Sequence, residues 1–257
     1  MPMIQSVERA LQIIDLFDEQ SPELKITSIS EKLGLNKSTV HSLLKTLQKH
    51  HYIEQNPENG KYKLGMKLVE RGNFIISTID IRQVAKKYLT DLANKTSQTT
   101  HLGILNGCEG VYVDKVEGAQ AVIRYSRIGR GIPLHATAVG KVLLAFQNPE
   151  EVQRLLDGYV YTRQTPNTIT EESELLKELE KVRKQGYAVD DQENEQGVRC
   201  IAVPILNYQN QVIAAISIST LVSRVNYREL EEYILLLKQA GQELSEEVGY
   251  GLFKDGK

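Results

Sequence analysis

One stretch of the chain, from Lys25 to Lys49, restricts the possible folds more than any other. A capping-box pattern at Ser28 and Glu31 precedes a short apolar run and predicts a first helix. Gly34 can adopt the left-handed conformation that ends this helix, and Asn36 is a favoured N-cap for a second one. The pattern therefore predicts two helices joined by a sharp turn, which is a helix-turn-helix arrangement.

The second predicted helix has an apolar stripe and a polar face. The stripe has the spacing of one buried helix side and consists of Val40, Leu43, Leu44 and Leu47. The other side carries short hydroxyls and cations near the helix N-terminus, where a recognition helix meets base edges and phosphates. The predicted DNA-contacting residues are Lys37, Ser38, Thr39, His41, Ser42 and Lys45, with Lys61 added from the following hairpin. The alternative is an ordinary helical hairpin whose polar face is simply solvated.

The residues after this helix predict a wing, which makes the plain hairpin less favoured. Tyr52 to Glu54 has the pattern of a strand, NPENG at 56–60 that of a turn, and Lys61 to Leu64 that of a returning strand. Between Leu35 and Lys63 there are five lysines and two glutamates, although the whole chain has a formal net charge of -2. Positive charge is thus concentrated where the phosphates of a DNA duplex would lie.

Composition excludes several other classes of protein. The chain has 257 residues, of which 41% are hydrophobic and 25% charged, an ordinary soluble mixture with room for two domains. It has no apolar run near the length of a membrane span and no signal-peptide pattern, so we expect a cytoplasmic protein without a membrane partner. Cys108 and Cys200 belong to no CxxC motif, so we expect no disulfide framework, metal site or cofactor.

Three segments follow from hydrophobic periodicity. Residues 1–65 are predicted to form the winged helix-turn-helix domain, in which an amphipathic helix from Ile4 to Phe17 supports the other two. Residues 66–80 are predicted to form a linker helix with more apolar side chains than a small domain can bury. This helix packs either on the same segment of a second subunit, giving a homodimer or homotetramer, or on its own second domain.

Residues 81–250 are predicted to be an α+β domain built on a mainly antiparallel sheet. Strands are predicted near both ends of this region, at 99–105, 111–116, 121–125, 187–189, 198–206 and 212–219. Helices are predicted at 81–97, 136–146, 150–156, 171–185 and 227–248. The turn GIPLH at 131–135 leads directly into the helix that begins near Thr137, and we expect the free N–H groups of Ala138, Val139 and Gly140 to favour a carboxylate.

Four further side chains are predicted to meet near that helix. Asp190 follows a strand, Cys200 lies on the next one, and Ser217 and Ser219 alternate with isoleucines, so their hydroxyls share a face. Each has another interpretation: the serines on a solvated strand, Cys200 as a core filler, and Asp190 as a turn cap. His101 and His135 are expected to be structural or to orient a ligand, because no paired metal-ligand spacing accompanies them.

At these residues the chain resembles the IclR family of bacterial transcription regulators. The resemblance rests on the winged helix, on PLHATAVGKVLLA at 133–145, on GVRCIAVPI at 197–205 and on SIS at 217–219. It implies an effector-binding domain with a GAF-like or PAS-like fold. It also implies contacts with a small keto acid through the backbone of Ala138 and Val139 and the side chains of Asp190, Cys200, Ser217 and Ser219. The Ala138-Val139 pair replaces the Gly-Ala of members that bind two- and three-carbon acids, which argues against a glyoxylate-type ligand.

Within that family, YSRIGR at 125–130 and THLG at 100–103 look most like the regulators of pectin and hexuronate breakdown, which respond to 2-keto-3-deoxygluconate. For such a ligand we expect Arg127 or Arg130 to pair with the carboxylate, and His101 and Tyr125 to bind hydroxyls.

The leading hypothesis is therefore a repressor that binds an operator in double-stranded DNA and is released by a sugar acid. Alternatives are an activator that responds to another carboxylic or aromatic acid, and an enzyme with Cys200 as nucleophile. No motif supports the enzyme, and we expect no catalytic residue.

Overall fold

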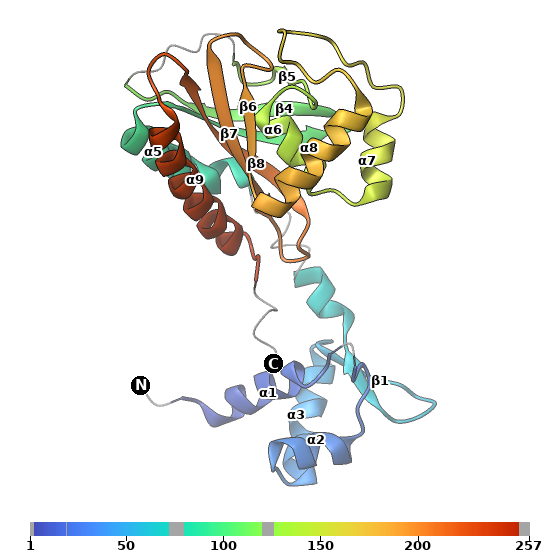
Figure 1. Cartoon of the computed structure of the whole chain (residues 1–257). Helices are drawn as coiled ribbons and strands as arrows, with labels where there is room; N and C mark the ends of the chain where they lie inside the picture. Colours follow the sequence, from blue (N-terminus) through green and yellow to red (C-terminus); the bar gives the residue numbers. More distant parts are fainter. Residues whose placement is uncertain (1–2, 19, 72–79, 120–125, 252–257) are drawn as a thin grey trace. The chain divides into compact units, whose positions relative to one another are not determined.

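The computed structural model describes residues 3–18, 20–71, 80–119 and 126–251, which fall into two compact units, Met1–Ile79 and Asp80–Lys257. The N-terminal unit contains α1 (Gln5–Asp15), α2 (Ile26–Leu33), α3 (Lys37–Lys49), β1 (Ile53–Gln55) and β2 (Tyr62–Leu64) (Figure 1). The two strands are antiparallel, with Ile53 opposite Leu64, which confirms the predicted wing. The helix-turn-helix is also confirmed, and Gly34 ends α2 in the left-handed conformation at φ 62°.

The capping-box prediction for α2 is wrong. The helix begins at Ile26 and its N-cap is Lys25, so Ser28 lies inside the first turn. The reason is the core: Ile26 packs against the same cluster as the fully buried Ile29, which starts the apolar stripe one turn earlier than predicted. Asn36 occupies the N-cap position of α3 as predicted, although its side chain makes no capping hydrogen bond.

The core of this unit joins all three helices to the wing. Ile13, Ile29, Val40, Leu44 and Ile53 have no exposed surface. Leu24, before α2, also pairs with Tyr62 of β2, so the wing is attached to the unit at its base. After β2 the chain is helical from residue 66 to residue 71, and the rest of the predicted linker helix, at 72–79, lies outside the described residues.

The C-terminal unit is a six-stranded antiparallel sheet of order β5-β4-β3-β8-β7-β6 with helices on both faces. Its strands are β3 (Thr99–Asn106), β4 (Glu109–Val116), β5 (Gly131–Ile132), β6 (Ala188–Asp191), β7 (Val198–Leu206) and β8 (Val212–Leu221). Its helices are α5 (Ile81–Thr96), α6 (Ala138–Ala145), α7 (Pro149–Leu156), α8 (Glu172–Gln185) and α9 (Tyr227–Glu247). This confirms the α+β prediction, while the strand predicted at 121–125 lies outside the described residues.

Each face of the sheet has its own apolar core. Helices α5 and α9 cover one face, where they pack on alternating side chains such as Ile201, Ile216 and Ile218. Helices α6, α7 and α8 cover the other face, where the sheet contributes smaller residues, Ala202 and Ala215 among them (Figure 1). The small side chains allow α6 to lie close to the middle of the sheet. No helix of the described part of the chain is long and apolar enough to cross a membrane.

Candidate functional site

The polar face of α3 is available to a partner. Lys37, Ser38, His41, Ser42 and Lys45 are exposed, and Thr39 is half-buried. On the opposite side Val40 and Leu44 are completely buried, so the helix cannot rotate without losing the core of the unit. The hydroxyl of Ser42 donates to the carbonyl of Ser38 at 3.1 Å, which leaves its oxygen as an acceptor on the exposed face.

The wing is fixed to the loop before α2. Asn56 and Asn59 in its turn donate to the two carboxylate oxygens of Glu23 at 3.2 and 2.9 Å, and these hydrogen bonds lower the pKa of Glu23. Lys63 lies 3.4 Å from Glu54 across the hairpin, whereas Lys61 is half-buried at the start of the returning strand. The turn of the wing is thus fixed to Glu23, in the same unit as α3.

The C-terminal unit contains a cavity of about 350 Å³ between the sheet and the N-terminus of α6. Strand pairing builds its floor: Asp190 lies opposite Cys200, Cys200 opposite Ser219, and Ser217 opposite His101. Directly opposed residues of antiparallel strands share a face, so side chains far apart in the sequence become one polar surface. Ser217 and Ser219 are 2% and 5% exposed, so the solvated-strand alternative is wrong.

His101 lies at the centre of this floor. Its Nε2 is 2.7 Å from the Ser126 hydroxyl, and its Nδ1 is 3.5 Å from the hydroxyls of both Ser217 and Ser219. Its ring lies against that of Tyr112, with centroids 4.9 Å apart. Burial, reinforced by the charge of Lys115, lowers the pKa of His101 to about 3, so the imidazole is neutral at physiological pH. A neutral ring can donate one hydrogen bond and accept another, which suits hydroxyl groups.

Asp190 lines the cavity and also caps a turn. Its Oδ1 accepts hydrogen bonds from the backbone N–H groups of Glu193 at 2.7 Å and Asn194 at 3.3 Å. The turn-cap interpretation is therefore confirmed, and it is compatible with a place in the cavity wall. Burial and the nearby Glu193 carboxylate raise the pKa of Asp190 to about 7. Asp190 was predicted to follow the strand at 187–189. That prediction is wrong, because the pairing of β6 with β7 extends through Asp191 and Asp190 is therefore part of β6.

Cys200 is next to Asp190 on β7, and its thiol donates to the Ser219 hydroxyl at 3.1 Å. Burial and the charge of Asp190 raise the pKa of this thiol. The environment thus opposes the thiolate that a nucleophilic cysteine needs. In the described part of the chain, no group of three His, Cys, Asp or Glu side chains is placed to hold a metal ion.

Helix α6 supplies another wall. Thr137, Ala138 and Val139 line the cavity, but the N–H of Gly140 donates to the Thr137 side chain at 3.0 Å. The prediction that this third N–H is free is therefore wrong, because the threonine caps the helix. A Cβ on Gly140 would lie 2.6 Å from the Leu134 Cα, so the glycine is what lets α6 begin so close to the preceding turn.

The two arginines differ in position. Arg130 lines the cavity, whereas Arg127 is exposed and is absent from its lining. Tyr125 lies outside the described residues. His135, the other predicted structural histidine, is buried and bonded to the Tyr159 hydroxyl at 2.9 Å and to the Thr162 carbonyl at 3.0 Å.

Sequence reasoning missed six polar residues that line the cavity: Tyr112, Ser126, Thr137, Gln164, Asn194 and Glu195. Ser126 lies in the YSRIGR segment at 125–130, so the sequence already indicated that this hydroxyl is near the ligand site. Gln164 lies in a loop that only the packing of the unit brings to the cavity. Thr165 in that loop donates to the carbonyl of Gln192 at 2.7 Å, which attaches the loop to the end of β6.

Two protein-family models match the chain. The IclR helix-turn-helix domain model matches residues 6–57, and the model for the bacterial transcriptional regulator IclR C-terminal domain matches residues 73–246. The chain belongs to the IclR family. It is a DNA-binding transcriptional regulator with an N-terminal helix-turn-helix domain and a C-terminal effector domain of mixed α/β structure.

Relatives within the IclR family match nearly the whole chain. The chain is 62% identical to the regulator XynR of Escherichia coli K12, over 97% of this chain and 99% of that protein. It is 38% identical to KdgR of the same organism, over 96% of this chain and 94% of KdgR. Among solved structures, the IclR protein of Thermotoga maritima is 35% identical, with a TM-score of 0.65 and coverage of 96% and 100%.

Proposed function

We propose that this IclR-family protein is a repressor whose affinity for its operator falls when a small sugar acid occupies the cavity of the C-terminal unit. The observation that carries the proposal is the character of the cavity: buried serines and a neutral imidazole face one another across adjacent strands. Such a surface suits a ligand with several hydroxyls. The resemblance of YSRIGR at 125–130 and THLG at 100–103 to the regulators of pectin and hexuronate breakdown supports 2-keto-3-deoxygluconate as the first ligand to test.

In this proposal the two ends of the ligand bind different walls. The carboxylate lies toward Arg130 and the backbone N–H groups of Ala138 and Val139, where a guanidinium and a helix N-terminus favour an anion. The hydroxyls lie toward His101, Ser217 and Ser219. A cavity of about 350 Å³ is at the small end of the range for ligand sites, which suits a small polar metabolite.

DNA binding is proposed to use the exposed face of α3 and the wing. A second copy of the chain would present a second α3 to the next half-site, and the linker segment would set their spacing. The ligand acts only through its difference in affinity for the DNA-binding and released states. A hundredfold loss of operator affinity requires a coupling free energy of about 2.7 kcal/mol, which a few charge-assisted hydrogen bonds formed in one state can supply.

The test is a DNA-binding titration with fragments of the promoter regions next to the gene for this protein. The expected result is specific binding that weakens by at least tenfold on addition of 2-keto-3-deoxygluconate. Glyoxylate and an aromatic carboxylic acid serve as ligand controls, and the Ser217→Ala, Ser219→Ala double variant should bind the fragment but lose the response. If another acid releases the DNA, the ligand assignment is wrong. If the ligand strengthens binding, or activates transcription, the repressor assignment is wrong.

A further inference from the structure

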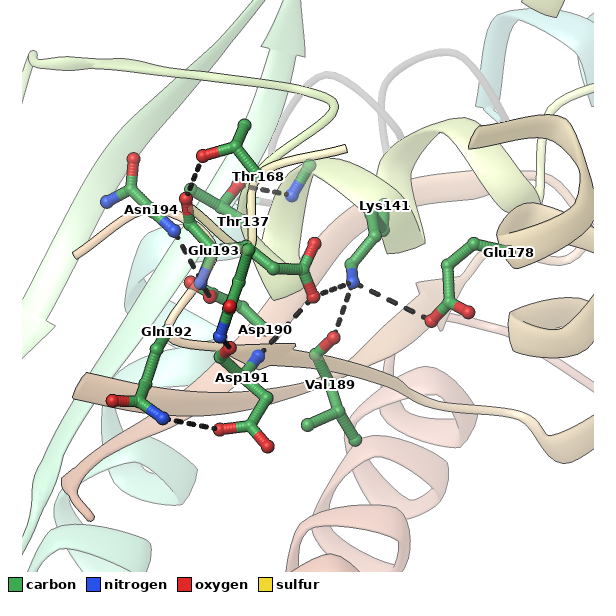
Figure 2. A network of polar contacts seen from close by, with 12 residues as sticks. Thr137, Lys141, Thr168, Glu178, Val189, Asp190, Asp191, Gln192, Glu193 and Asn194 are labelled. Carbon is green, nitrogen blue, oxygen red and sulfur yellow. Dashed lines mark hydrogen bonds and ion pairs between the residues drawn. The ribbon is translucent and has the colours of Figure 1, made fainter. Parts of the chain in front are cut away.

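A charged cluster lies behind the cavity, inside the core that α6 and α8 share. Lys141 of α6 has no exposed surface, although its neighbours on the helix are apolar. Its ammonium group lies 2.7 Å from Glu193 Oε1 and 3.6 Å from Glu178 Oε1, and it donates to the carbonyl of Val189 (Figure 2). A buried ammonium is costly unless it is paired, and an apolar side chain of similar size often stabilises such a core as well or better.

The contacts of Lys141 lead directly to the cavity. Val189 precedes Asp190, and the N–H of Glu193 donates to the Asp190 carboxylate at 2.7 Å. Asp190, Asn194 and Glu195 all line the cavity, so the segment 190–195 is one of its walls. Lys141 thus holds this segment on both sides of Asp190, through the carbonyl of Val189 and the carboxylate of Glu193, as Figure 2 shows.

The same segment is held from its other side by neutral groups. Thr168 donates to the carbonyl of Glu193 at 2.6 Å, and Thr165 donates to the same carbonyl at 3.2 Å. The carboxylate of Glu193 is less completely satisfied: its Oε2 is buried and has no hydrogen-bond partner among the described residues. Buried polar atoms without a hydrogen-bond partner are uncommon in folded proteins, so packing stability by itself does not explain this arrangement.

Lys141 also lies on the helix whose first residues, Ala138 and Val139, form another wall of the cavity. One side chain therefore connects the helix N-terminus with the 190–195 segment. We propose that Lys141 and Glu193 are positioning residues: their ion pair sets the separation of these two walls and thereby the affinity for the effector. This inference rests on the proposed function of the cavity, and neither residue is proposed to touch the ligand.

The first test needs no ligand and measures amide hydrogen exchange in the full-length protein. Glu193→Gln keeps the size of the side chain and removes its charge. Exchange at the amide of Asn194 and in the first turn of α6 should become at least tenfold faster, because the walls separate more often. The matched control is Glu178→Gln, which removes a charge near the same ammonium but lies on α8, and its exchange rates should stay within twofold of wild type. Equal exchange in the Glu193→Gln variant and the wild-type protein would overturn the inference.

The second test separates positioning from stability by titrating 2-keto-3-deoxygluconate in a calorimeter. Lys141→Met leaves the buried Glu193 carboxylate without its cation, whereas Glu178 keeps its ion pair with Lys181, and the variant should have a lower melting temperature. The double variant Lys141→Met, Glu193→Gln should recover much of that loss and yet bind the ligand at least tenfold more weakly than wild type, with operator affinity in the absence of ligand unchanged. Ligand affinity that recovers together with the melting temperature would show a structural role only. If the wild-type protein does not bind this ligand, the proposed effector is wrong, and the exchange experiment still decides the role of the ion pair.

Discussion

At the scale of single residues, Asp190 shows how the fold changes the chemistry of a side chain. The residue is 2% exposed, and its carboxyl group accepts two backbone hydrogen bonds and lies near Glu193. Burial and the neighbouring carboxylate both oppose its negative charge, so its pKa rises to about 7. A carboxyl that is partly neutral at physiological pH suits a cavity proposed to bind an anion, because it repels the anion less.

This pKa predicts how stability depends on pH. The pKa of Asp190 is higher in the folded protein than in the unfolded chain. Its contribution to the free energy of unfolding is therefore fully present below about pH 4 and is lost as the pH rises through about 7. Asp190→Asn keeps an oxygen for the two N–H groups and removes the charge. The variant should therefore melt at a higher temperature than wild type at pH 8, and the difference should shrink toward pH 4. A difference in melting temperature that is the same at both pH values would contradict the raised pKa.

A substitution of Lys45 tests whether the exposed side of α3 binds DNA. The Lys45 side chain is exposed on the polar side of α3, whereas the preceding residue, Leu44, is completely buried. If Lys45 binds a phosphate, Lys45→Ala should weaken operator binding and reduce the slope of log affinity against log salt concentration by about 0.9. Fluorescence anisotropy over a salt series measures both quantities. Lys184→Ala, an exposed lysine of α8, is the control, and a variant whose slope equals that of wild type would remove Lys45 from the phosphate contacts.

At the scale of secondary-structure elements, α6 determines the geometry of the cavity. It is a short helix of eight residues, all of them buried, and it packs on the alanines of β7 and β8. Two glycines permit this position. A Cβ on Gly140 would lie 2.6 Å from backbone atoms of Pro133 and Leu134, and a Cβ on Gly103 of β3 would lie 2.6 Å from the Val139 side chain. The helix N-terminus can therefore approach the sheet closely enough to close the cavity.

Gly140→Ala is expected to disturb this arrangement. The atoms that the new methyl group would meet belong to the backbone, so α6 or the turn before it must move, at a cost of about 1–3 kcal/mol in the free energy of unfolding. Chemical denaturation measures that cost. Gly131→Ala is a matched control, because a Cβ at Gly131 meets nothing within 4 Å. A Gly140→Ala protein as stable as wild type, with unchanged ligand response, would show that the close approach of α6 is not needed.

At the scale of the whole molecule, the chain combines a unit that has the features of a DNA reader with a unit that has a small-molecule cavity. Under the proposed function the two are coupled thermodynamically. Coupling between two binding sites is reciprocal, so a ligand that weakens operator binding by some factor must itself be bound more weakly, by the same factor, when the operator is present.

The reciprocal effect can be measured by calorimetric titration of 2-keto-3-deoxygluconate into the free protein and into its complex with an operator duplex. The two ligand dissociation constants should differ by the factor found in the DNA titrations. A duplex of scrambled sequence is the control and should leave ligand affinity unchanged at the same salt concentration. Equal affinities for free and operator-bound protein would show that the ligand does not act through DNA release.

Local patterns in the sequence were sufficient for the family and for most of the elements that the structure describes, apart from boundaries such as the start of α2. Helical spacing identified α3, whose stripe of Val40 and Leu44 is completely buried, and period-two alternation placed the hydroxyls of Ser217 and Ser219 on one face. Both inferences depend on the geometry of a single helix or strand, which is the same in every fold. The family resemblance likewise rested on continuous segments of sequence.

Only the tertiary structure decided which side chains are in contact and which of the buried ones carry a charge. The start of α2 moved from Ser28 to Ile26 because the core needed Ile26, and Thr137 bonded the Gly140 N–H that was expected to be free. Gln164 reached the cavity and Lys141 reached Glu193 through the packing of loops and helices on the sheet. The physical reason is that burial and long-range contacts depend on every neighbour at once, whereas periodicity depends only on the nearest residues along the chain.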